Sequence, residues 1–308
     1  MVRLSAAAEY LAANHERLGL DRFGIPARPS SIVLTPRFRR SRHIVVLVLA
    51  PGRREPVLVA KLPRLAGDGD GLAAEAGNLM VVGRMLAEDD RGTLPTVLAF
   101  ESGGDYPLLL ETALAGSPLS PRALRRDRET IVQKAAGWLR RLASATAAAP
   151  PDKAWYERLI GAPLRRLADD RARPAGVREM AMRTLAVSEG LRDSELPLVC
   201  THGDFGHPNL LCQADGRLGV LDWERAEPAG LPGDDLFFFL AYAAQRDGRA
   251  PFFGRRPWAW RIAEDYAERV GIDRRLLRPL VAVSCARALD ASAAAARMTP
   301  LWHGALAG

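Results

Sequence analysis

The chain has 308 residues, of which 48% are hydrophobic and 26% are charged, a composition typical of a globular protein with one large or two ordinary domains. Its net charge of +7 comes with 43 basic residues, and only Lys61, Lys134 and Lys153 among these are lysines. The arginines are scattered rather than gathered in one stripe, and no nucleic-acid-binding motif is present. The charge therefore does not indicate a nucleic-acid partner.

Apolar stretches such as residues 44–50 are far shorter than the roughly 20 residues that a membrane-spanning helix needs. Charged residues interrupt the N-terminal segment at a helical rhythm, which is not the pattern of a signal peptide. The cysteines, at positions 200, 212 and 285, lack metal-binding spacing and are interpreted as free thiols. We therefore expect a cytoplasmic protein without a membrane partner or disulfide bonds.

The first part of the chain alternates between strand and helix patterns. After an N-terminal helix, runs rich in Val, Ile and Leu predict strands at 31–35, 43–50, 56–61, 97–101 and 107–111. A Gly/Asp-rich connection at 67–71 leads into a helix predicted over about residues 72–86. The successive strands joined by short turns indicate an antiparallel sheet with one helix.

From residue 123 onward the pattern becomes mainly helical, with helices predicted at 129–145, 154–168 and 177–192. A β-rich interruption follows, with a strand at 198–200 and a hairpin at 209–223 whose turn is Asp215-Gly216. The fold class is therefore α+β. We divide the chain into an N-terminal lobe, residues 1–112, and a helical C-terminal lobe, residues 113–308.

The hairpin brings together Asn209, which opens its first strand, and Asp222, which closes its second, while Asp204 lies in the loop just ahead. Metal-assisted phosphoryl transfer needs carboxylate and amide oxygens on magnesium and a separate carboxylate at the attacking hydroxyl. His202-Gly203-Asp204, Asn209 and Asp222 supply that set in that order. Either motif alone is a common chance pattern, whereas their joint order around a hairpin favours phosphoryl transfer.

The segment THGDFGHPNLL, followed by LDWE, resembles the signature of the aminoglycoside phosphotransferase and choline kinase-like family, which shares the bilobal protein-kinase-like fold. This resemblance implies that Asp204 is the catalytic base and that Asn209 and Asp222 bind Mg²⁺. It also implies that His202 supports the catalytic loop, and it makes Glu224 a candidate for the outer shell of the metal.

A kinase-like site also needs a lysine at the end of the third strand to hold the nucleotide phosphates and a helix glutamate to position it. Lys61 and Glu75 stand at these places. Lysine is informative in a chain that otherwise uses arginine, because a compact ammonium and a planar guanidinium contact phosphate differently. By themselves, the two residues are equally explained by a surface lysine and a glutamate that favours the helix dipole.

Residues 108–120 resemble the hinge of the family, where backbone groups of Glu111, Thr112 and Ala113 would meet a purine edge of ATP or GTP. The loop expected over the phosphates, TPRFRRSRH, departs from the family because it has no glycine. Ser41 is the candidate phosphate contact there, and solvated arginines at a hairpin tip are the alternative interpretation. Asp235 is interpreted as structural, either capping a helix or bracing the catalytic loop.

In the family, acceptor recognition resides in the helical part, and core packing or a solvated helix face is the alternative interpretation of the residues found there. The candidates form an aromatic and acidic tract: Phe252, Phe253, Trp258, Trp260, Glu264, Asp265, Tyr266 and Glu268.

The sequence thus predicts a magnesium-dependent O-phosphotransferase that moves the γ-phosphate of ATP or GTP to a hydroxyl of a small molecule. The acceptor classes are an aminoglycoside, another natural-product antibiotic, a sugar or an amino alcohol, with antibiotic resistance as one biological role. The glycine-free loop motivates an alternative, a catalytically inactive kinase-like module that only binds nucleotide. A protein kinase is disfavoured because Gly203 stands where that class has a basic residue.

Overall fold

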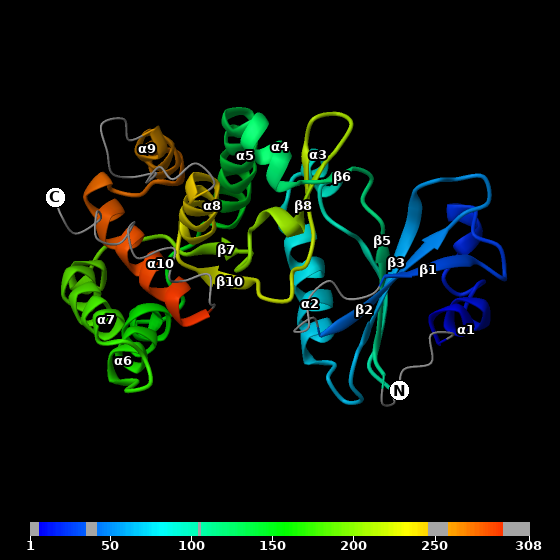
Figure 1. Cartoon of the computed structure of the whole chain (residues 1–308), viewed down its shortest axis with the longest axis horizontal. Helices are drawn as coiled ribbons and strands as arrows, with labels where there is room; N and C mark the ends of the chain where they lie inside the picture. The colour runs from blue at the N-terminus through cyan, green and yellow to red at the C-terminus, as the bar shows by residue number, and fades with distance from the viewer. Residues whose placement is uncertain (1–5, 35–41, 104–105, 246–257, 292–308) are drawn as a thin grey trace. The chain divides into compact units, whose positions relative to one another are not determined.

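A computed structural model describes residues 6–34, 42–103, 106–245 and 258–291 (Figure 1). Contacts within the chain divide it into two units. The first unit consists of Met1–Pro118 and Asn209–Ala226, and the second consists of Leu119–Pro208 and Glu227–Gly308. The division expected at residue 112 assigns the predicted hairpin 209–223 to the second lobe, whereas the segment 209–226, which contains it, belongs to the first unit.

The first unit is built on a five-stranded antiparallel sheet with the strand order β1-β2-β3-β5-β4. Its strands are β1 (Ser30–Leu34), β2 (His43–Leu49), β3 (Pro56–Pro63), β4 (Val97–Glu101) and β5 (Leu108–Thr112). Each strand falls within a residue or two of its predicted position, because Val-, Ile- and Leu-rich runs suit a sheet that is buried between helices. The predicted antiparallel sheet is confirmed.

Helices cover both faces of this sheet (Figure 1). They are α1 (Ala6–Ala13) with the short turn η1 (Leu20–Phe23) on one face and α2 (Asp70–Met85) on the other, and the short α3 (Glu88–Arg91) follows α2. On one face Leu11 of α1 packs in the same core as Leu58 and Ala60 of β3. On the other face Leu72 of α2 packs with Leu109 of β5. Since side chains alternate along a strand, Lys61 lies on the α2 side of the sheet.

The hairpin that returns to the first unit consists of β8 (Leu210–Cys212) and β9 (Leu218–Val220), with β6 (Ser117–Pro118) beside β8. The Val220 N–H donates to the carbonyl of Thr93 at 2.8 Å, and Gln213 Nε2 donates to the carbonyl of Gly92 at 3.0 Å. These bonds attach the hairpin to the segment after α3. The predicted Asp215-Gly216 turn is confirmed, and Gly216 adopts φ 84°.

The second unit is mainly helical. Its helices are α4 (Pro121–Arg126), α5 (Arg128–Thr146), α6 (Ala162–Asp169), α7 (Ala175–Ser188), α8 (Asp234–Gln245), α9 (Trp258–Val270) and α10 (Leu277–Ala291). The shorter elements are a π-turn, η2 (Glu157–Gly161), and the turns η3 (Glu189–Leu191), η4 (His207–Asn209) and η5 (Arg274–Leu276), the last residue of η4 entering the first unit. Strands β7 (Val199–Thr201) and β10 (Glu227–Gly230) pair antiparallel.

The sequence did not indicate β10, which reads Glu-Pro-Ala-Gly and pairs with β7 through a register shift. Proline and glycine are poor strand formers, so this strand exists because of its tertiary partner. In the described part of the chain, no helix is both long enough and apolar enough to span a membrane.

Candidate active site

A buried ion cluster surrounds Lys61 in the first unit. Lys61 Nζ donates to Glu75 Oε1 at 2.6 Å and lies 3.0 Å from Glu111 Oε1, and all three residues are buried. Burial by itself lowers the pKa of Lys61, but Glu111 and Glu75 outweigh it and raise that pKa, so the ammonium stays charged. Burial raises the pKa of Glu111 to about 7, although Lys61 opposes the shift. The structure thus brings the predicted pair together and adds a second carboxylate.

Helix α2 connects this cluster to the loop that follows β9. Glu75 Oε1 also accepts a hydrogen bond from the Trp223 N–H at 3.2 Å. Asn78, three residues further along α2, donates to the carbonyls of Trp223 at 2.8 Å and Ala226 at 3.3 Å. Sequence reasoning missed Asn78, and its spacing from Glu75, which places both on one helix face, is the signal that could have identified it.

Asn209 and Asp222 stand at the two ends of the hairpin, where the Leu221 N–H donates to the carbonyl of Asn209 at 2.9 Å. Asp222 has φ 66°, a left-handed conformation that is uncommon outside glycine and typical of functional sites. Its carboxylate is close enough to contribute to the raised pKa of Lys61. The hairpin therefore fixes a carboxylate and an amide in one part of the first unit.

The residue types at this position fit Mg²⁺. Carboxylate and amide oxygens are hard ligands, and magnesium usually keeps waters and substrate phosphates in its remaining positions. Among the described residues, no group of three or more His, Cys, Asp or Glu side chains is arranged to hold a metal. A site with two protein ligands completed by nucleotide and water is consistent with both facts.

Glu224 is fixed beside the beginning of α2. Its Oε2 lies 3.8 Å from His43 Nδ1, and burial lowers the pKa of His43 even though the Glu224 carboxylate opposes that shift. A Cβ atom at Gly71 would lie 2.8 Å from Glu224 Oε2 and 3.2 Å from the His43 ring, so a larger residue there would displace these side chains. His43 was not identified from the sequence, because a histidine that opens a strand carries no motif.

Of the three predicted hinge residues, Thr112 and Ala113 have backbone N–H groups that donate within the first unit. The Thr112 N–H donates to the carbonyl of Thr96 at 2.9 Å, and the Ala113 N–H donates to the carbonyl of Val57 at 3.0 Å. Glu111, the remaining hinge residue, turns its side chain to Lys61. The side chain of Glu111 is therefore part of the site, which a backbone-only hinge does not predict.

In the second unit, Asp235 at the start of α8 holds the loop that carries Asp204. Its carboxylate accepts the N–H of His202 at 2.6 Å and the N–H of Gly203 at 3.0 Å. The Asp204 N–H in turn donates to His202 Nδ1 at 3.2 Å. The interpretation of Asp235 as a brace for this loop is confirmed.

Aromatic packing around Phe205, the residue after Asp204, supports the same loop. Phe205 is fully buried and stacks on Trp138 with the ring centroids 5.6 Å apart. Its ring also meets the edges of Phe239 at 5.7 Å and of His202 at 6.0 Å. This packing holds the backbone of the loop rigidly while Asp204 itself remains only half-buried.

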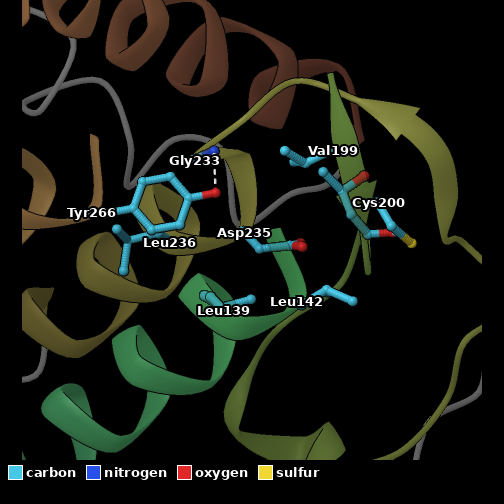
Figure 2. Close-up of a pocket in the computed structure, with 9 residues that line it drawn as sticks. Leu139, Leu142, Val199, Cys200, Gly233, Asp235, Leu236 and Tyr266 are labelled. Carbon is cyan, nitrogen blue, oxygen red and sulfur yellow. Dashed lines mark hydrogen bonds between the residues drawn. The ribbon is translucent and has the colours of Figure 1, made fainter. Parts of the chain in front are cut away.

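Figure 2 shows a small cavity behind this loop, lined by residues of α5, β7, α8 and α9. It has room for about one water molecule, which is too little for a substrate. Burial raises the pKa of Asp235 to about 7, although the two backbone N–H groups that donate to it oppose the shift. Beside it, the Tyr266 hydroxyl accepts a hydrogen bond from the Gly233 N–H at 3.2 Å. The cavity belongs to the support of the loop and is not a binding pocket.

Several predicted residues lie outside the described part of the chain: Ser41, Phe252 and Phe253. Arg42, the neighbour of Ser41, forms an ion pair with Asp68. The predicted phosphate contact of Ser41 remains a prediction.

The remaining acceptor candidates lie on α9, and most of them have structural partners. Tyr266 is buried, and Asp265 pairs with Arg140 and Arg269. The other contacts join Trp258 to Arg128, Trp260 to Arg278, and Glu268 to Arg274, while Glu264 is half-buried. These contacts favour core packing and a solvated helix face over acceptor recognition for most of the tract.

Comparison with known proteins identifies the class to which this site belongs. The model of the phosphotransferase enzyme family matches residues 45–280, which include Lys61, Glu75, Asp204, Asn209 and Asp222. The chain therefore belongs to the phosphotransferase enzyme family and is a phosphotransferase. No curated protein sequence matches it.

Solved structures of small-molecule phosphotransferases share its fold. The aminoglycoside phosphotransferase APH(3'')-Id from Streptomyces rimosus, in complex with ADP and streptomycin, is 20% identical, with a TM-score of 0.52 and coverage of 91% of this chain and 98% of its own. The macrolide 2'-phosphotransferase MphH from Brachybacterium faecium is 18% identical, with a TM-score of 0.57 and 98% of both chains covered. The GDP and kanamycin complex of APH(2")-IIia is 13% identical, with a TM-score of 0.56, covering 95% and 96%. These identities show the fold, which is protein-kinase-like.

Proposed function

We propose that the chain is a magnesium-dependent O-phosphotransferase that moves the γ-phosphate of a nucleoside triphosphate to a hydroxyl group of a small molecule in the cytoplasm. The observation that carries the proposal is the hydrogen-bonded cluster of Lys61, Glu75 and the Trp223 N–H. Glu75 Oε1 accepts hydrogen bonds both from Lys61, the proposed phosphate-binding lysine, and from the backbone N–H of Trp223, the residue after Asp222. Such a cluster serves a reaction that needs the lysine and the metal ligand in register.

The first unit would bind the nucleotide. Lys61 keeps its charge in a buried place, so its ammonium can bind phosphate oxygens with little competition from water. Asn209 and Asp222 would hold Mg²⁺ together with those oxygens. When bound, the metal neutralises negative charge that the leaving nucleoside diphosphate develops.

Asp204 would orient the acceptor hydroxyl and take its proton. A bond forms between the acceptor oxygen and the γ-phosphorus, and the bond from that phosphorus to the bridging oxygen breaks, its electron pair leaving with the diphosphate. The proton of the hydroxyl moves to the Asp204 carboxylate. Asp235 is a positioning residue, since it fixes the backbone of the loop and does not reach the reacting atoms.

The acceptor is proposed by class. The solved relatives are complexes with streptomycin or kanamycin, or are named for macrolides. We therefore propose a hydroxylated small molecule of this kind, either an aminoglycoside or another natural-product antibiotic, with a sugar or an amino alcohol as further candidates. Antibiotic resistance is the role that the first two classes support.

A mass-spectrometric screen tests the proposal. The wild type and Asp204→Asn are incubated with Mg²⁺, ATP or GTP, and a pooled panel of aminoglycosides, macrolides, sugars and amino alcohols. We expect the wild type alone to add one phosphoryl group to a panel member. A fully active Asp204→Asn enzyme would contradict the proposed role of Asp204, and magnesium-dependent nucleotide binding without any transfer would favour the inactive binding module.

A further inference from the structure

Glu111 has a carboxylate oxygen that the proposed chemistry leaves unused. The residue is 2% exposed, and its Oε1 faces Lys61 Nζ at 3.0 Å. Its Oε2 is buried and accepts no hydrogen bond from any described residue. A buried acceptor without a partner is costly, so proteins retain one mainly where a ligand or water completes it.

The sheet register shows what lies beside this oxygen. Directly opposite residues place Ile32 of β1 next to Leu47 of β2, Leu47 next to Val59 of β3, and Val59 next to Glu111 of β5. Opposite residues share one face of a sheet, so three apolar side chains form a strip that ends at a carboxylate. Ile32 is 49% exposed, and Leu47 and Val59 are only half-buried.

Lys61 stands in the neighbouring row of the same face, two residues beyond Val59 on β3. A ligand with a flat apolar part on the strip can therefore direct its phosphates toward Lys61. Its flat part would then present an edge to Glu111. A nucleotide has this shape, with a base at one end and phosphates at the other.

A carboxylate can only accept hydrogen bonds, so it binds the edge of a base that carries an N–H donor. At position 6 adenine has an amino group, whereas guanine and hypoxanthine have a carbonyl oxygen, so a carboxylate that faces position 6 binds adenine and repels the other two. The N–H groups of Thr112 and Ala113 both donate within the first unit, so neither is in place to donate to the ring nitrogens of a base. The buried Oε2 of Glu111, at the end of the apolar strip, is an acceptor in place to bind the 6-amino group.

We propose that Glu111 Oε2 accepts a hydrogen bond from the 6-amino group of a bound adenine, so that the enzyme selects ATP over GTP. The inference rests on the proposed function, because it assumes that a nucleoside triphosphate binds on the Lys61 face of the sheet. It makes Glu111 a specificity-determining residue in addition to a partner of Lys61.

The experiment measures affinity by isothermal titration calorimetry with Mg²⁺ at about pH 8, above the raised pKa of Glu111. The nucleotides are ATP, GTP and purine riboside triphosphate, which is ATP without the 6-amino group. A hydrogen bond to a charged acceptor is worth about 1.5–3 kcal/mol, so the wild type should bind ATP roughly 10- to 100-fold more tightly than either analogue.

The variant is Glu111→Gln, which keeps the size of the side chain and leaves Lys61 paired with Glu75. A glutamine amide can present either its oxygen or its NH₂ group, so the ratio of ATP to GTP affinity should fall to within about twofold. Glu55→Gln, at an exposed position just before β3, is the matched control and should keep the wild-type ratio.

The outcomes separate the two proposals. Equal binding of all three nucleotides by the wild type, or an unchanged ratio in Glu111→Gln, overturns the role of Glu111 and leaves the phosphotransferase proposal intact. Failure of the wild type to bind any of the nucleotides overturns both.

Discussion

The two units position their functional groups by different physical means. In the first unit, Lys61 is held by ion pairs with Glu75 and Glu111 in a buried place. In the second unit, Asp204 is held indirectly, because Asp235 and the aromatic rings around Phe205 fix the backbone that carries it. The comparison suggests that changes near Lys61 alter folding stability and nucleotide affinity together, whereas changes near Asp204 alter turnover with less effect on stability.

The strongest test of the second-unit side of this comparison is Asp204→Asn. The substitution keeps the shape of the side chain and removes its capacity to take a proton, which is worth about 10²- to 10⁴-fold in rate. We expect kcat to fall about 1000-fold while nucleotide affinity, measured by calorimetry, stays within about twofold. A fall in affinity as large as the fall in kcat would contradict the separation of roles.

The corresponding test of the first unit is Lys61→Ala. It leaves Glu75 and Glu111 facing each other without a cation, and breaking a buried ion pair costs about 3–5 kcal/mol. Denaturant unfolding should show a loss of this size, together with loss of ATP binding. Combining Lys61→Ala with Glu111→Gln removes the repulsion and should restore part of the stability, and no restoration would show that the carboxylates do not interact.

Asp235→Asn tests whether the loop beneath Asp204 depends on one carboxylate. Asparagine has one acceptor oxygen in place of two, so one of the backbone donors of His202 and Gly203 loses its partner, at about 1–3 kcal/mol. We expect lower stability and a lower kcat, with little change in nucleotide affinity.

The difference in the free energy of unfolding between the wild type and Asp235→Asn should depend on pH. Asp235 has a pKa of about 7 in the folded protein, against an ordinary value of 3.8, so between these values the folded state binds a proton that the unfolded chain has lost. The free energy of unfolding of the wild type should therefore fall relative to that of Asp235→Asn as the pH rises from about 5 to about 7. A difference that grows over this range would show that burial does not raise this pKa.

The smallest effect is expected from Gly203→Ala. Gly203 has φ 78°, and alanine in the left-handed region costs about 1–2 kcal/mol. Gly206→Ala is the matched control, since a Cβ there meets its nearest atom at 3.5 Å, an ordinary contact distance. We expect Gly203→Ala to reduce kcat several-fold by moving the Asp204 backbone, and equal effects of the two variants in a kinetic assay would refute this.

The sequence was sufficient to predict most elements and the pairing of Lys61 with Glu75, because both follow from local patterns. Strand runs alternate visibly, and the Asp215-Gly216 turn determines the hairpin. The contacts of Asn78 with the loop after β9 could not be predicted in this way, because they join residues about 145 positions apart. The side chain of Glu111 was missed for a related reason, since only the strand register shows which face it occupies.

The assignment of the hairpin to the first unit was likewise out of reach of local patterns. Its sequence lies within a helical half, and its long-range bonds, such as those to Gly92, Thr93 and Glu75, reveal the unit in which it is packed. A division of the chain at residue 112 follows from the change in composition. Composition does not show that the later segment 209–226 packs in the first unit.

The packing of segment 209–226 in the first unit affects the order in which the protein folds during synthesis. Residues 1–118 are translated first, yet their unit includes 209–226, so nascent α2 emerges long before the loop that its Glu75 and Asn78 contact. The five strands of the N-terminal sheet are all translated by residue 112, but the first unit lacks the segment 209–226 until about ninety residues after residue 118 have been translated. In a nascent chain stalled before the loop after β9, the polar side chains of Glu75 and Asn78 on α2 would lack these partners and be exposed to chaperones.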